Sequence, residues 1–412
     1  MTTTKNNEHK KLNFSSEREQ SQACLNSAEH EKNQGRKVLN VPNLRFPEFQ
    51  GEWEEERLAD IADLYKGTGI SKDQLSDDGE PCILYGELYT KYKSETIREV
   101  ISKTNIDNTK LVRSKANDVI IPCSGETAED IATARCVLNG NILLGGDLNI
   151  IRLHGYDGAF MSYQLNGRRK YDIAKVAQGV SVVHLYGEHL KGVKTINPCL
   201  EEQKKIASLL ALLDERITTQ NKIIDKLQSL IKGIRNDVFG KLRKNIGFNA
   251  VVVDVLDYEQ PQSYIVEDTE YTNEGTPVLT ANKAFVLGYT LETDGIYDKG
   301  DCIIFDDFTL DCKYVDFPFK VKSSAIKILT AKNKELLRYT FEFLKYLDLS
   351  TEEHKRHYIA ETQNQEFILP TEQIVKTIAY IFSTLSLRME TAVKRRDVFD
   401  KQKQYLLRQM FI

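Results

Sequence analysis

Long hydrophobic runs are missing from this chain of 412 residues. None approaches the roughly 18 consecutive apolar residues that a membrane-spanning helix needs. The beginning of the sequence also has no apolar stretch of the kind that a secretory signal peptide carries. The sequence therefore predicts a protein without a membrane partner and, by default, a cytoplasmic location.

Paired cysteines are missing as well. The seven cysteines stand at positions 24, 82, 123, 136, 199, 302 and 312, and they form no CxxC pair and no spacing typical of a zinc site. Free or buried thiols in a reducing compartment are the expectation for such a pattern. We predict no disulfide framework and no structural metal.

Motifs of catalysis are also lacking. There is no GxxxxGK[ST] and no HExxH among the seven histidines. Gly145-Gly146 is too short for the glycine-rich turn of a dinucleotide or methyl-donor site. Asn197-Pro198 lacks the aromatic residue of an amino-methyltransferase tetrapeptide. We expect no catalytic residue, no metal ligand and no cofactor in this chain.

One acidic cluster leaves an enzymatic alternative open. Asp301, Asp306 and Asp307 precede the triplet Asp311-Cys312-Lys313, which imitates the carboxylates and the lysine of a Mg²⁺-dependent nuclease. A D-x-K triplet occurs by chance in many proteins. Ordinary residues at strand ends and in loops are the simpler interpretation.

An excess of positive charge is absent. Lys and Arg number 56 against 60 Asp and Glu, so the formal net charge is −4. The total excludes a chain coated in positive charge but not nucleic-acid binding, because a local basic face matters more. An acidic total also fits a subunit that docks onto larger partners. Local basic clusters, which equally suit plain solvated surface, occur at Lys91 with Lys93, at 168–170, at Lys320 with Lys322 and at 355–357.

The sequence does contain one helical pattern twice. Pro198 opens a run that ends at Phe239, and Pro370, 172 residues later, opens a run that ends at Phe411. A shared period of this size indicates two copies of one unit. Each copy is a mixed domain of roughly 150 residues followed by a long helix. Two similar domains on paired helices suit a protein that spans a long ligand, and duplex DNA is the obvious candidate.

These patterns predict an α+β fold with two mixed α/β domains separated by two long antiparallel coiled-coil helices. We place a disordered polar tail at 1–40, a first domain at 41–197, a first helix at 198–240, a second domain at 241–369 and a second helix at 370–412.

Short apolar runs at 81–89, 118–125 and 148–155 predict strands in the first domain, and 159–179 has helical spacing. Each of these segments has a counterpart in the second domain. The offsets drift from 196 to 172 residues along the chain, as expected if loops vary while the helices repeat rigidly.

Apolar residues in both helices alternate in steps of four and three, which is the seam of a coiled coil. Gln220 is the polar position of the first seam and is expected to fix its register, whereas Arg396 and Lys403 interrupt the second. The first seam comprises Ile206, Leu210, Leu213, Ile217, Gln220, Ile224, Leu227, Ile231, Ile234 and Val238. The second comprises Ile378, Phe382, Leu385, Met389, Ala392, Arg396, Phe399, Lys403, Leu406 and Met410.

A helix over residues 201–239 would be about 58 Å long at 1.5 Å per residue. That length corresponds to about 17 base pairs of duplex DNA. An antiparallel pair would place the two domains at opposite ends, and a parallel pair would place them side by side. A helical stalk for dimerisation is the alternative interpretation of the helices taken alone.

The segment from Lys175 to Ile234 resembles the DNA-specificity subunit of a type I restriction-modification system. The similarity is carried by 177–179 (Ala-Gln-Gly), Leu185, Leu190, Pro198, Glu202-Gln203 and Ile206-Ala207, and by the opening LRFPEFQGEWEEERLADIA at 44–62. The resemblance covers residues 43–412. In the second copy, Glu372-Gln373 lies earlier relative to the Ile-Ala pair, and no Ala-Gln-Gly element is found at 358–367.

The resemblance implies that each mixed domain is a target-recognition domain for one half of a split DNA site. The two helices would set the gap and would dock two methyltransferase subunits, which carry S-adenosylmethionine. A motor-nuclease (restriction) subunit could join that core. The specificity subunit itself would carry no catalysis.

Candidate DNA contacts are donors, acceptors and cations at predicted loops and strand ends. In the first domain they are Lys66, Thr68, Ser71, Lys72, Lys91, Lys93, Ser124, Glu126, Thr127, Arg135, Gln178 and His184. In the second they are Gln262, Tyr264, Asn282, Lys283, Asp306, Lys313, Lys320, Lys322, Arg356 and His357. The remaining alternatives are a non-enzymatic coiled-coil scaffold or partner-binding protein that does not bind DNA, and a nuclease built around Asp311.

Overall fold

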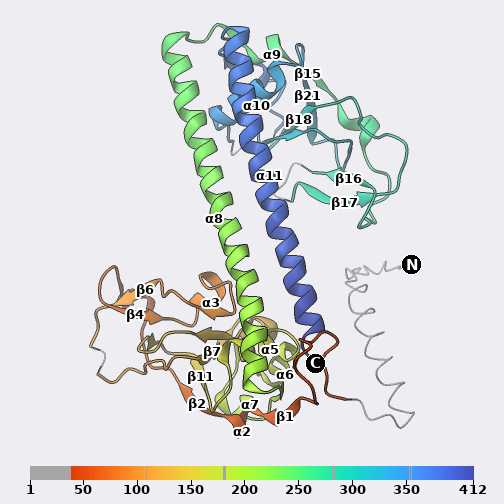
Figure 1. Cartoon of the computed structure of the whole chain (residues 1–412). Coiled ribbons are helices and arrows are strands. Elements are labelled where there is room, and N and C mark those ends of the chain that lie inside the picture. The colour runs from red at the N-terminus through yellow and green to blue at the C-terminus, as the bar shows by residue number, and fades with distance from the viewer. Residues whose placement is uncertain (1–38, 108, 180–181, 281–283, 352, 354) are drawn as a thin grey trace, which may run out of the picture. The chain divides into compact units, whose positions relative to one another are not determined.

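The computed structural model describes residues 39–412 except 108, 180–181, 281–283, 352 and 354 (Figure 1). The tail predicted at 1–40 lies outside the described residues apart from its last two. Two compact units make up the chain: unit 1 takes the chain up to Glu215 together with Asp400–Ile412, and unit 2 takes Arg216–Phe399. Both limits fall inside the long helices α8 (Leu200–Asn245) and α11 (Glu372–Gln409). The first turns of α8 and the last turn of α11 pack within unit 1, which explains the difference from the predicted boundaries.

Unit 1 is built on two sheets. The larger has the order β2-β11-β7-β9-β5, and the smaller has the order β10-β4-β6-β3. All five residues of β7 are buried, as expected for an apolar strand covered on both faces. The strands of the larger sheet are β2 (Ala62–Lys66), β11 (Leu148–Leu153), β7 (Asp118–Pro122), β9 (Arg135–Val137) and β5 (Thr96–Ile97). Those of the smaller are β10 (Leu143–Leu144), β4 (Glu80–Ile83), β6 (Ser102–Thr104) and β3 (Leu75–Ser76).

Two short strand pairs and several short helices complete unit 1. The pairs are β1 (Glu54–Arg57) with β13 (Lys194–Asn197) and β8 (Ser124–Gly125) with β12 (Val183–His184). The helices are α2 (Leu58–Ile61), η2 (Lys72–Gln74), α3 (Glu87–Thr90), α4 (Ala128–Ile131), α5 (Gly158–Asn166), α6 (Lys170–Val176) and α7 (Gly187–Leu190).

Two sequence predictions for unit 1 are wrong in detail. The strand expected over 81–89 ends at Ile83, and the chain then turns into α3. The helix expected over 159–179 is two helices, because α5 ends at Gly167, whose N–H donates to the carbonyl of Tyr163 at 3.0 Å. Glycine at this position is a common helix terminator.

Unit 2 has the same architecture. Its sheets have the orders β15-β21-β18-β19 and β17-β16-β20. The strands are β15 (Leu256–Glu259), β21 (Ile326–Ala331), β18 (Cys302–Asp306), β19 (Cys312–Val315), β17 (Val286–Thr290), β16 (Thr276–Leu279), β20 (Lys320–Val321), and the pair β14 (Ala250–Val251) and β22 (Glu366–Phe367). The helices are α9 (Val252–Val255), η3 (Pro261–Tyr264), α10 (Leu336–Leu347) and η4 (Thr362–Asn364).

The strand order shows the internal repeat directly. β2-β11-β7-β9 of unit 1 corresponds to β15-β21-β18-β19 of unit 2, and every neighbouring pair in both series is antiparallel. In the smaller sheets, the β10–β4 and β20–β16 pairs are both parallel. The mixed α/β fold predicted from the sequence is therefore confirmed, and it occurs twice.

The two long helices run antiparallel within unit 2. The guanidinium of Arg216 lies 5.5 Å from the ring centroid of Phe399, and that of Arg235 lies 5.9 Å from the ring centroid of Phe382. Later residues of α8 therefore contact earlier residues of α11, as in an antiparallel pair. Each predicted seam position of both helices is buried or half-buried in its own unit.

The first helix is longer than predicted. It continues through Gly240 to Asn245 because Leu242 still packs against the core of unit 2. It ends before Gly247, whose φ of 75° is a left-handed conformation that glycine adopts without strain. At 46 residues, α8 is about 69 Å long at 1.5 Å per residue.

The two predicted interruptions of the second seam behave differently. Lys403 is buried, and its ammonium lies 2.6 Å from the carboxylate of Asp214 in α8. It therefore fills a seam position through an ion pair rather than breaking the seam. Arg396 is half-buried and pairs with the adjacent Asp397.

The start of α8 explains where the second copy departs from the first. Glu202 is fully buried and binds the guanidinium of Arg45 through two hydrogen bonds of 2.8 and 2.7 Å. The positions 172 residues later hold Ile374 and Val375, of which Val375 is buried in the apolar core of unit 2. Ile374, at the position of Glu202, is exposed, and unit 2 thus has the buried apolar side chain of Val375 where unit 1 has the buried amide of Gln203.

Candidate nucleic-acid interface

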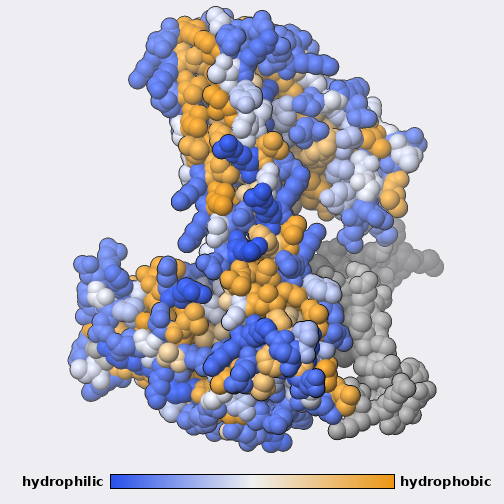
Figure 2. Space-filling view, viewed as in Figure 1, coloured by the Kyte–Doolittle hydropathy of each residue, from blue (hydrophilic) through white to orange (hydrophobic). Residues whose placement is uncertain are grey.

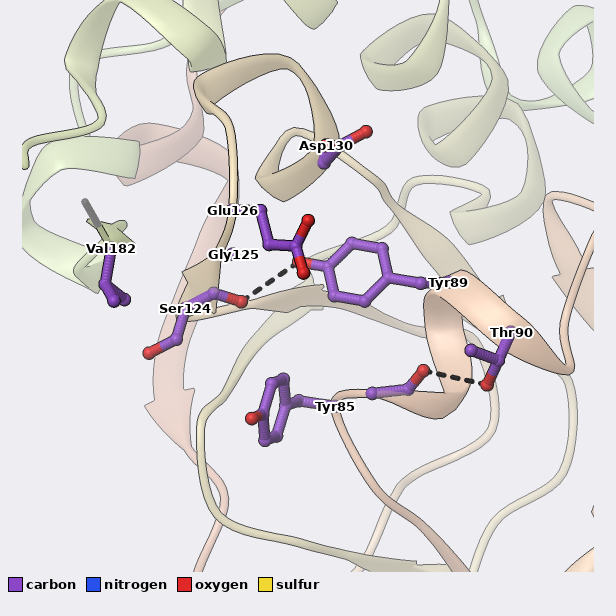
Figure 3. Close-up of a pocket in the computed structure, with 9 residues that line it drawn as sticks. Tyr85, Tyr89, Thr90, Ser124, Gly125, Glu126, Asp130 and Val182 are labelled. Atoms are coloured by element: carbon purple, nitrogen blue, oxygen red, sulfur yellow. Dashed lines mark hydrogen bonds between the residues drawn. The ribbon is translucent and has the colours of Figure 1, made fainter. Parts of the chain in front are cut away.

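A cavity of about 600 Å³ opens on unit 1 between α3 and β8 (Figure 3). Tyrosine rings form part of its wall, and the carboxylate of Glu126 points toward the ring of Tyr89 (Figure 3). Two sequence-predicted contacts, Ser124 and Glu126, come together here. The lining residues are Tyr85, Gly86, Tyr89, Thr90, Ser124, Gly125, Glu126, Asp130 and Val182.

Short-range contacts fix the strand that forms one side of this cavity. β8 pairs with β12, so that Ser124 faces His184 and the two side chains approach to 3.3 Å. The hydroxyl of Tyr89 donates to the carbonyl of Ser124 at 3.0 Å (Figure 3). A Cβ at Gly125 would lie 3.1 Å from that hydroxyl, so glycine permits the close approach of α3 and β8.

Some polar groups in and beside the cavity already make hydrogen bonds within the protein, and others do not. The hydroxyl of Thr127 caps α4, accepting from the Asp130 N–H at 3.0 Å and donating to its carboxylate at 2.6 Å. The hydroxyl of Thr90 donates to the Gly86 carbonyl at 3.0 Å. Glu126 is exposed, and within the described part of the chain no hydrogen bond or ion pair holds its carboxylate.

A second cavity, of about 710 Å³, adjoins the first and shares Tyr85, Gly86 and Thr90 with it. Three further predicted residues line it: Ser71, Lys72 and Lys91. Lys91 is an ion-pair partner of Glu87 at 2.7 Å. Ser71 and Gln74 form the capping box of η2, which leaves the side chain of Lys72 exposed at its first turn.

Other predicted residues of unit 1 lie outside these cavities. Lys66 ends β2 with its ammonium 3.9 Å from Asp147, and the Thr68 hydroxyl accepts from the Val112 N–H. Lys93 is exposed and donates to the carbonyl of Tyr89 at 2.7 Å. The exposed Gln178 is joined to His184 by two backbone hydrogen bonds.

Arg135 does not occupy the exposed position that was predicted for it. Its guanidinium donates to the carbonyls of Tyr92 and Ala134, inside unit 1. Burial lowers its pKa, while the carboxylates of Glu95 and Asp214 act in the opposite direction. The strand β9 turns this side chain inward, so that it is half-buried rather than exposed.

Unit 2 places four of its predicted residues at or near the surface. They are Gln262, Lys313, Lys322 and Arg356, of which Lys313 is half-buried. The guanidinium of Arg356 lies 5.9 Å from the Phe308 ring centroid. Asn282 and Lys283 lie outside the described residues.

Four other predicted residues of unit 2 are buried, which corrects the expectation that they lie on exposed loops. The ammonium of Lys320 donates to the Asp294 carbonyl at 2.7 Å and pairs with Glu292. Burial of such groups is tolerated because each has a partner. Asp306 accepts from the N–H groups of two following residues, Tyr264 donates to Glu259, and His357 faces Glu361.

The acidic cluster of unit 2 is committed to other contacts. Asp311 pairs with Lys345 at 2.7 Å and with Lys313 at 3.1 Å, and Lys345 and Lys313 hold the pKa of this carboxyl below its usual range against the opposing effect of burial. Asp307 accepts from two backbone N–H groups and lies 3.4 Å from Lys327. Among the described residues, no group of three or more acidic, His or Cys side chains is arranged to hold a metal ion.

The sequence prediction missed the aromatic wall of the first cavity. Tyr85 and Tyr89 stand four residues apart beside Lys91 and Lys93. Aromatic residues interleaved with cations are typical of nucleic-acid-binding surfaces, so this spacing was the available signal. The strand predicted over 81–89 contains both tyrosines, and this prediction overlooks the turn after Ile83 that exposes Tyr85.

No helix in the described part of the chain combines the length and the apolar composition required to cross a bilayer.

Known proteins share both sequence and fold with this chain. Residues 50–229 match the sequence model of the family described as "Type I restriction modification DNA specificity domain". The specificity subunit of the type I restriction enzyme EcoR124I/EcoR124II from Escherichia coli is 45% identical over 124 residues, which is 28% of this chain and 31% of that protein. The MjaVIII specificity subunit from Methanocaldococcus jannaschii is 28% identical over 199 residues, which is 48% of this chain and 44% of that protein. The chain thus spans less than half the length of either relative.

A crystal structure of the S subunit of a type I restriction-modification system from M. genitalium has the same fold. It aligns with a TM-score of 0.67 and 16% sequence identity, covering 90% of this chain and 99% of that one. The family match spans most of unit 1 and α8 as far as residue 229, and the repeated topology described above extends the same architecture to unit 2. Over residues 50–229 the chain is therefore similar in sequence to the specificity domain of type I restriction-modification systems, and its fold is that of one such subunit.

Proposed function

We propose that this chain is the non-catalytic subunit that selects the DNA sequence for a type I restriction-modification complex. Each unit recognises one half of a bipartite, gapped site in duplex DNA. The observation that carries the proposal is the strand order shared by the two units, each of which leads into one of the long helices. Two copies of one recognition fold with different surface residues suit two different half-sites.

Phosphate and base contacts fall to different side chains in this proposal. The exposed cations Lys72 and Lys93 in unit 1 and Lys322 and Arg356 in unit 2 contact phosphates, which positions the duplex without selecting sequence. The acceptor and donor groups in the cavity beside α3 contact base edges. Cations facing phosphate supply most of the affinity, and base-edge contacts supply the discrimination.

The long helices set the length of the unread gap. A helix of 46 residues extends about 69 Å, comparable to about 20 base pairs of duplex at 3.4 Å each. The antiparallel pairing and the buried ion pair between Lys403 and Asp214 fix the register of α8 against α11. Register of this kind keeps the gap constant.

The same helices dock two methyltransferase subunits, which bring the S-adenosylmethionine, and the assembled core accepts a restriction subunit. Apolar side chains lie exposed on both helices outside the seam. Figure 2 shows hydrophobic side chains gathered along the part of α8 in unit 2, where Ile223 and Leu230 are exposed. On α11, Leu387 and Val398 are also exposed. Exposed apolar side chains of this kind mark protein contact sites.

Methylation mapping in a host that carries the complete system tests the proposal. The expected motif is two short defined sequences separated by a fixed number of undefined bases. Substitution of Ser124 by Ala is expected to change one defined half and to leave the other half and the gap unaltered. A continuous methylated motif would contradict the proposal.

Retention of DNA provides an independent test. The chain purified with its methyltransferase partner is expected to retard a duplex with the mapped motif more than a duplex with a scrambled motif. Equal retardation of both, or of neither, would favour the coiled-coil scaffold that does not recognise DNA sequence.

A further inference from the structure

We infer that Glu126 accepts a hydrogen bond from the exocyclic amino group of one base in the half-site that unit 1 recognises. The inference rests on the proposed function and assigns a chemical class to one of its contacts. It starts from the cavity beside α3, which joins an exposed carboxylate to aromatic walls and lies next to a cavity lined by lysines.

The charges of the first cavity exclude a phosphate from it. Its charged lining residues are Glu126 and Asp130, and both are acidic. A phosphate close to a carboxylate would be repelled, even at the dielectric constant of water. The adjoining cavity is lined by the cations Lys72 and Lys91 together with Glu87 and Asp147. Lys91 pairs with Glu87, whereas Lys72 is exposed. The backbone of a bound duplex is therefore expected along the second cavity and base edges along the first.

Glu126 is the carboxylate of the first cavity that has no hydrogen bond or ion pair within the described residues. The carboxylate of Asp130 is held by the hydroxyl of Thr127 at 2.6 Å. The carbonyl of Ser124 already accepts from Tyr89. An ionised carboxylate accepts hydrogen bonds but donates none. In the major groove, the donors that a base edge offers are the amino groups of cytosine N4 and adenine N6.

The position of Glu126 is held on both sides. The residue before it ends β8, which pairs with β12, and the residue after it caps α4. A side chain held between two such elements loses little backbone entropy on binding. The exposed Tyr85 and Val182 on the cavity wall offer apolar surface to the base whose amino group is bound.

The test compares Glu126→Ala with Glu129→Ala in the complete methyltransferase complex. Glu129 is an exposed carboxylate on α4 that does not line the cavity, so its variant controls for the loss of one negative charge. Binding is measured with duplexes carrying the mapped motif. One base of the unit 1 half-site is replaced at a time by an analogue that lacks the exocyclic amino group. Purine, which has no 6-amino group, replaces adenine, and pyrimidinone, which has no 4-amino group, replaces cytosine.

For the wild type and Glu129→Ala, one such replacement is expected to weaken binding about tenfold. For Glu126→Ala, binding to the unmodified motif falls by about the same factor and the same replacement has no additional effect. The inference is overturned if Glu126→Ala responds to every replacement as the wild type does, or if it weakens binding to all sequences equally. If the wild-type complex shows no preference for the gapped motif at all, the proposed function itself fails.

Discussion

The ammonium of Lys403 lies 2.6 Å from Oδ1 of Asp214, which joins the last turns of α11 to the first turns of α8 inside unit 1. The same ammonium reaches the carboxylate of Glu95 at 2.5 Å. The other oxygen of Asp214 accepts from the hydroxyls of Tyr163 at 2.6 Å and Ser94 at 3.0 Å. Burial alone would lower the pKa of Lys403, but the two carboxylates outweigh it and the net pKa is raised. The lysine is therefore charged throughout the neutral range.

Substitution of Lys403 by Met is expected to destabilise unit 1 by about 3 kcal/mol, because it leaves the buried Asp214 and the half-buried Glu95 without their cation. The measurement is urea unfolding monitored by hydrogen exchange in α5 and α8. Lys401→Met, at an exposed position two residues earlier, serves as the control and is expected to change stability by less than about 0.5 kcal/mol. Equal stability of the two variants would show that the ion pair contributes nothing.

Unit 2 joins α10 to α8 through a different set of charges. Glu342 of α10 is buried and accepts from Arg235 of α8 at 2.7 Å and from Arg338 at 2.8 Å. Glu342→Gln is expected to cost about 3 kcal/mol, since it leaves two guanidinium groups facing an uncharged amide. Hydrogen exchange of unit 2 amides measures the loss. Glu335→Gln removes a carboxylate from an exposed ion pair with Lys376, and a comparable loss there would contradict the assignment.

The stability of unit 2 is expected to depend on pH through His357. A hydrogen bond to Glu361 at 2.9 Å raises the pKa of His357, although burial and Lys355 oppose the shift. Because the pKa of His357 is higher in the folded state than in the unfolded state, protonation stabilises the fold. This stabilisation is fully present below the unfolded-state pKa of about 6.5 and is lost as the pH rises through the folded-state pKa. The melting temperature of the wild type should therefore exceed that of Glu361→Gln by more at pH 6 than at pH 9. A difference that is constant, or larger at pH 9, would rule out this contribution.

Phosphate contacts by unit 1 should appear in the salt dependence of DNA binding. Lys72→Ala and Lys93→Ala are each expected to weaken binding to all sequences and to lower the slope of log K against log salt by about 1. Lys241→Ala removes a cation of α8 that pairs with Asp237 and is the matched control. A change in sequence preference without a change in slope would assign the lysines to base contacts.

Thiol reactivity provides a check on the fold that does not involve DNA. Cys82, Cys123, Cys136, Cys302 and Cys312 are buried free thiols, whereas Cys199 is exposed. Burial raises the pKa of Cys82 and of Cys123 to about 11, which suppresses the reactive thiolate. In a Cys24→Ser background, a maleimide should label Cys199 quickly and the other cysteines only after denaturant is added. Rapid labelling of Cys123 in the native protein would contradict the packing of β7.

Much of the fold could be predicted because periodicity is a local property. The steps of four and three along both helices identified every seam position. Matched apolar runs identified the strands β7, β18, β11 and β21, whose side chains are buried in both units. The first helix was predicted to end at residue 240, whereas packing of Leu242 carries it to Asn245.

The candidate site was predicted less well, because burial depends on contacts between residues distant in the chain. Lys320 and His357 looked like surface cations, but both have partners inside unit 2. Arg135 looked like a phosphate ligand, but it donates to carbonyls in unit 1. The cavity beside α3 is lined by segments near residues 85–90, 124–130 and 182. No spacing in the sequence predicts that these three segments lie close together.

The sequence by itself determined that one mixed domain and one long helix occur twice, because a 172-residue repeat and a heptad seam are visible without coordinates. The tertiary structure decided which charged side chains remain available to a ligand. Desolvation makes a buried charge bind a partner, so Lys403 and Lys320 are committed to the interior while Lys72 and Glu126 stay exposed. Which charged side chains are buried depends on how the strands and helices pack together, and only the folded chain brings those segments into contact.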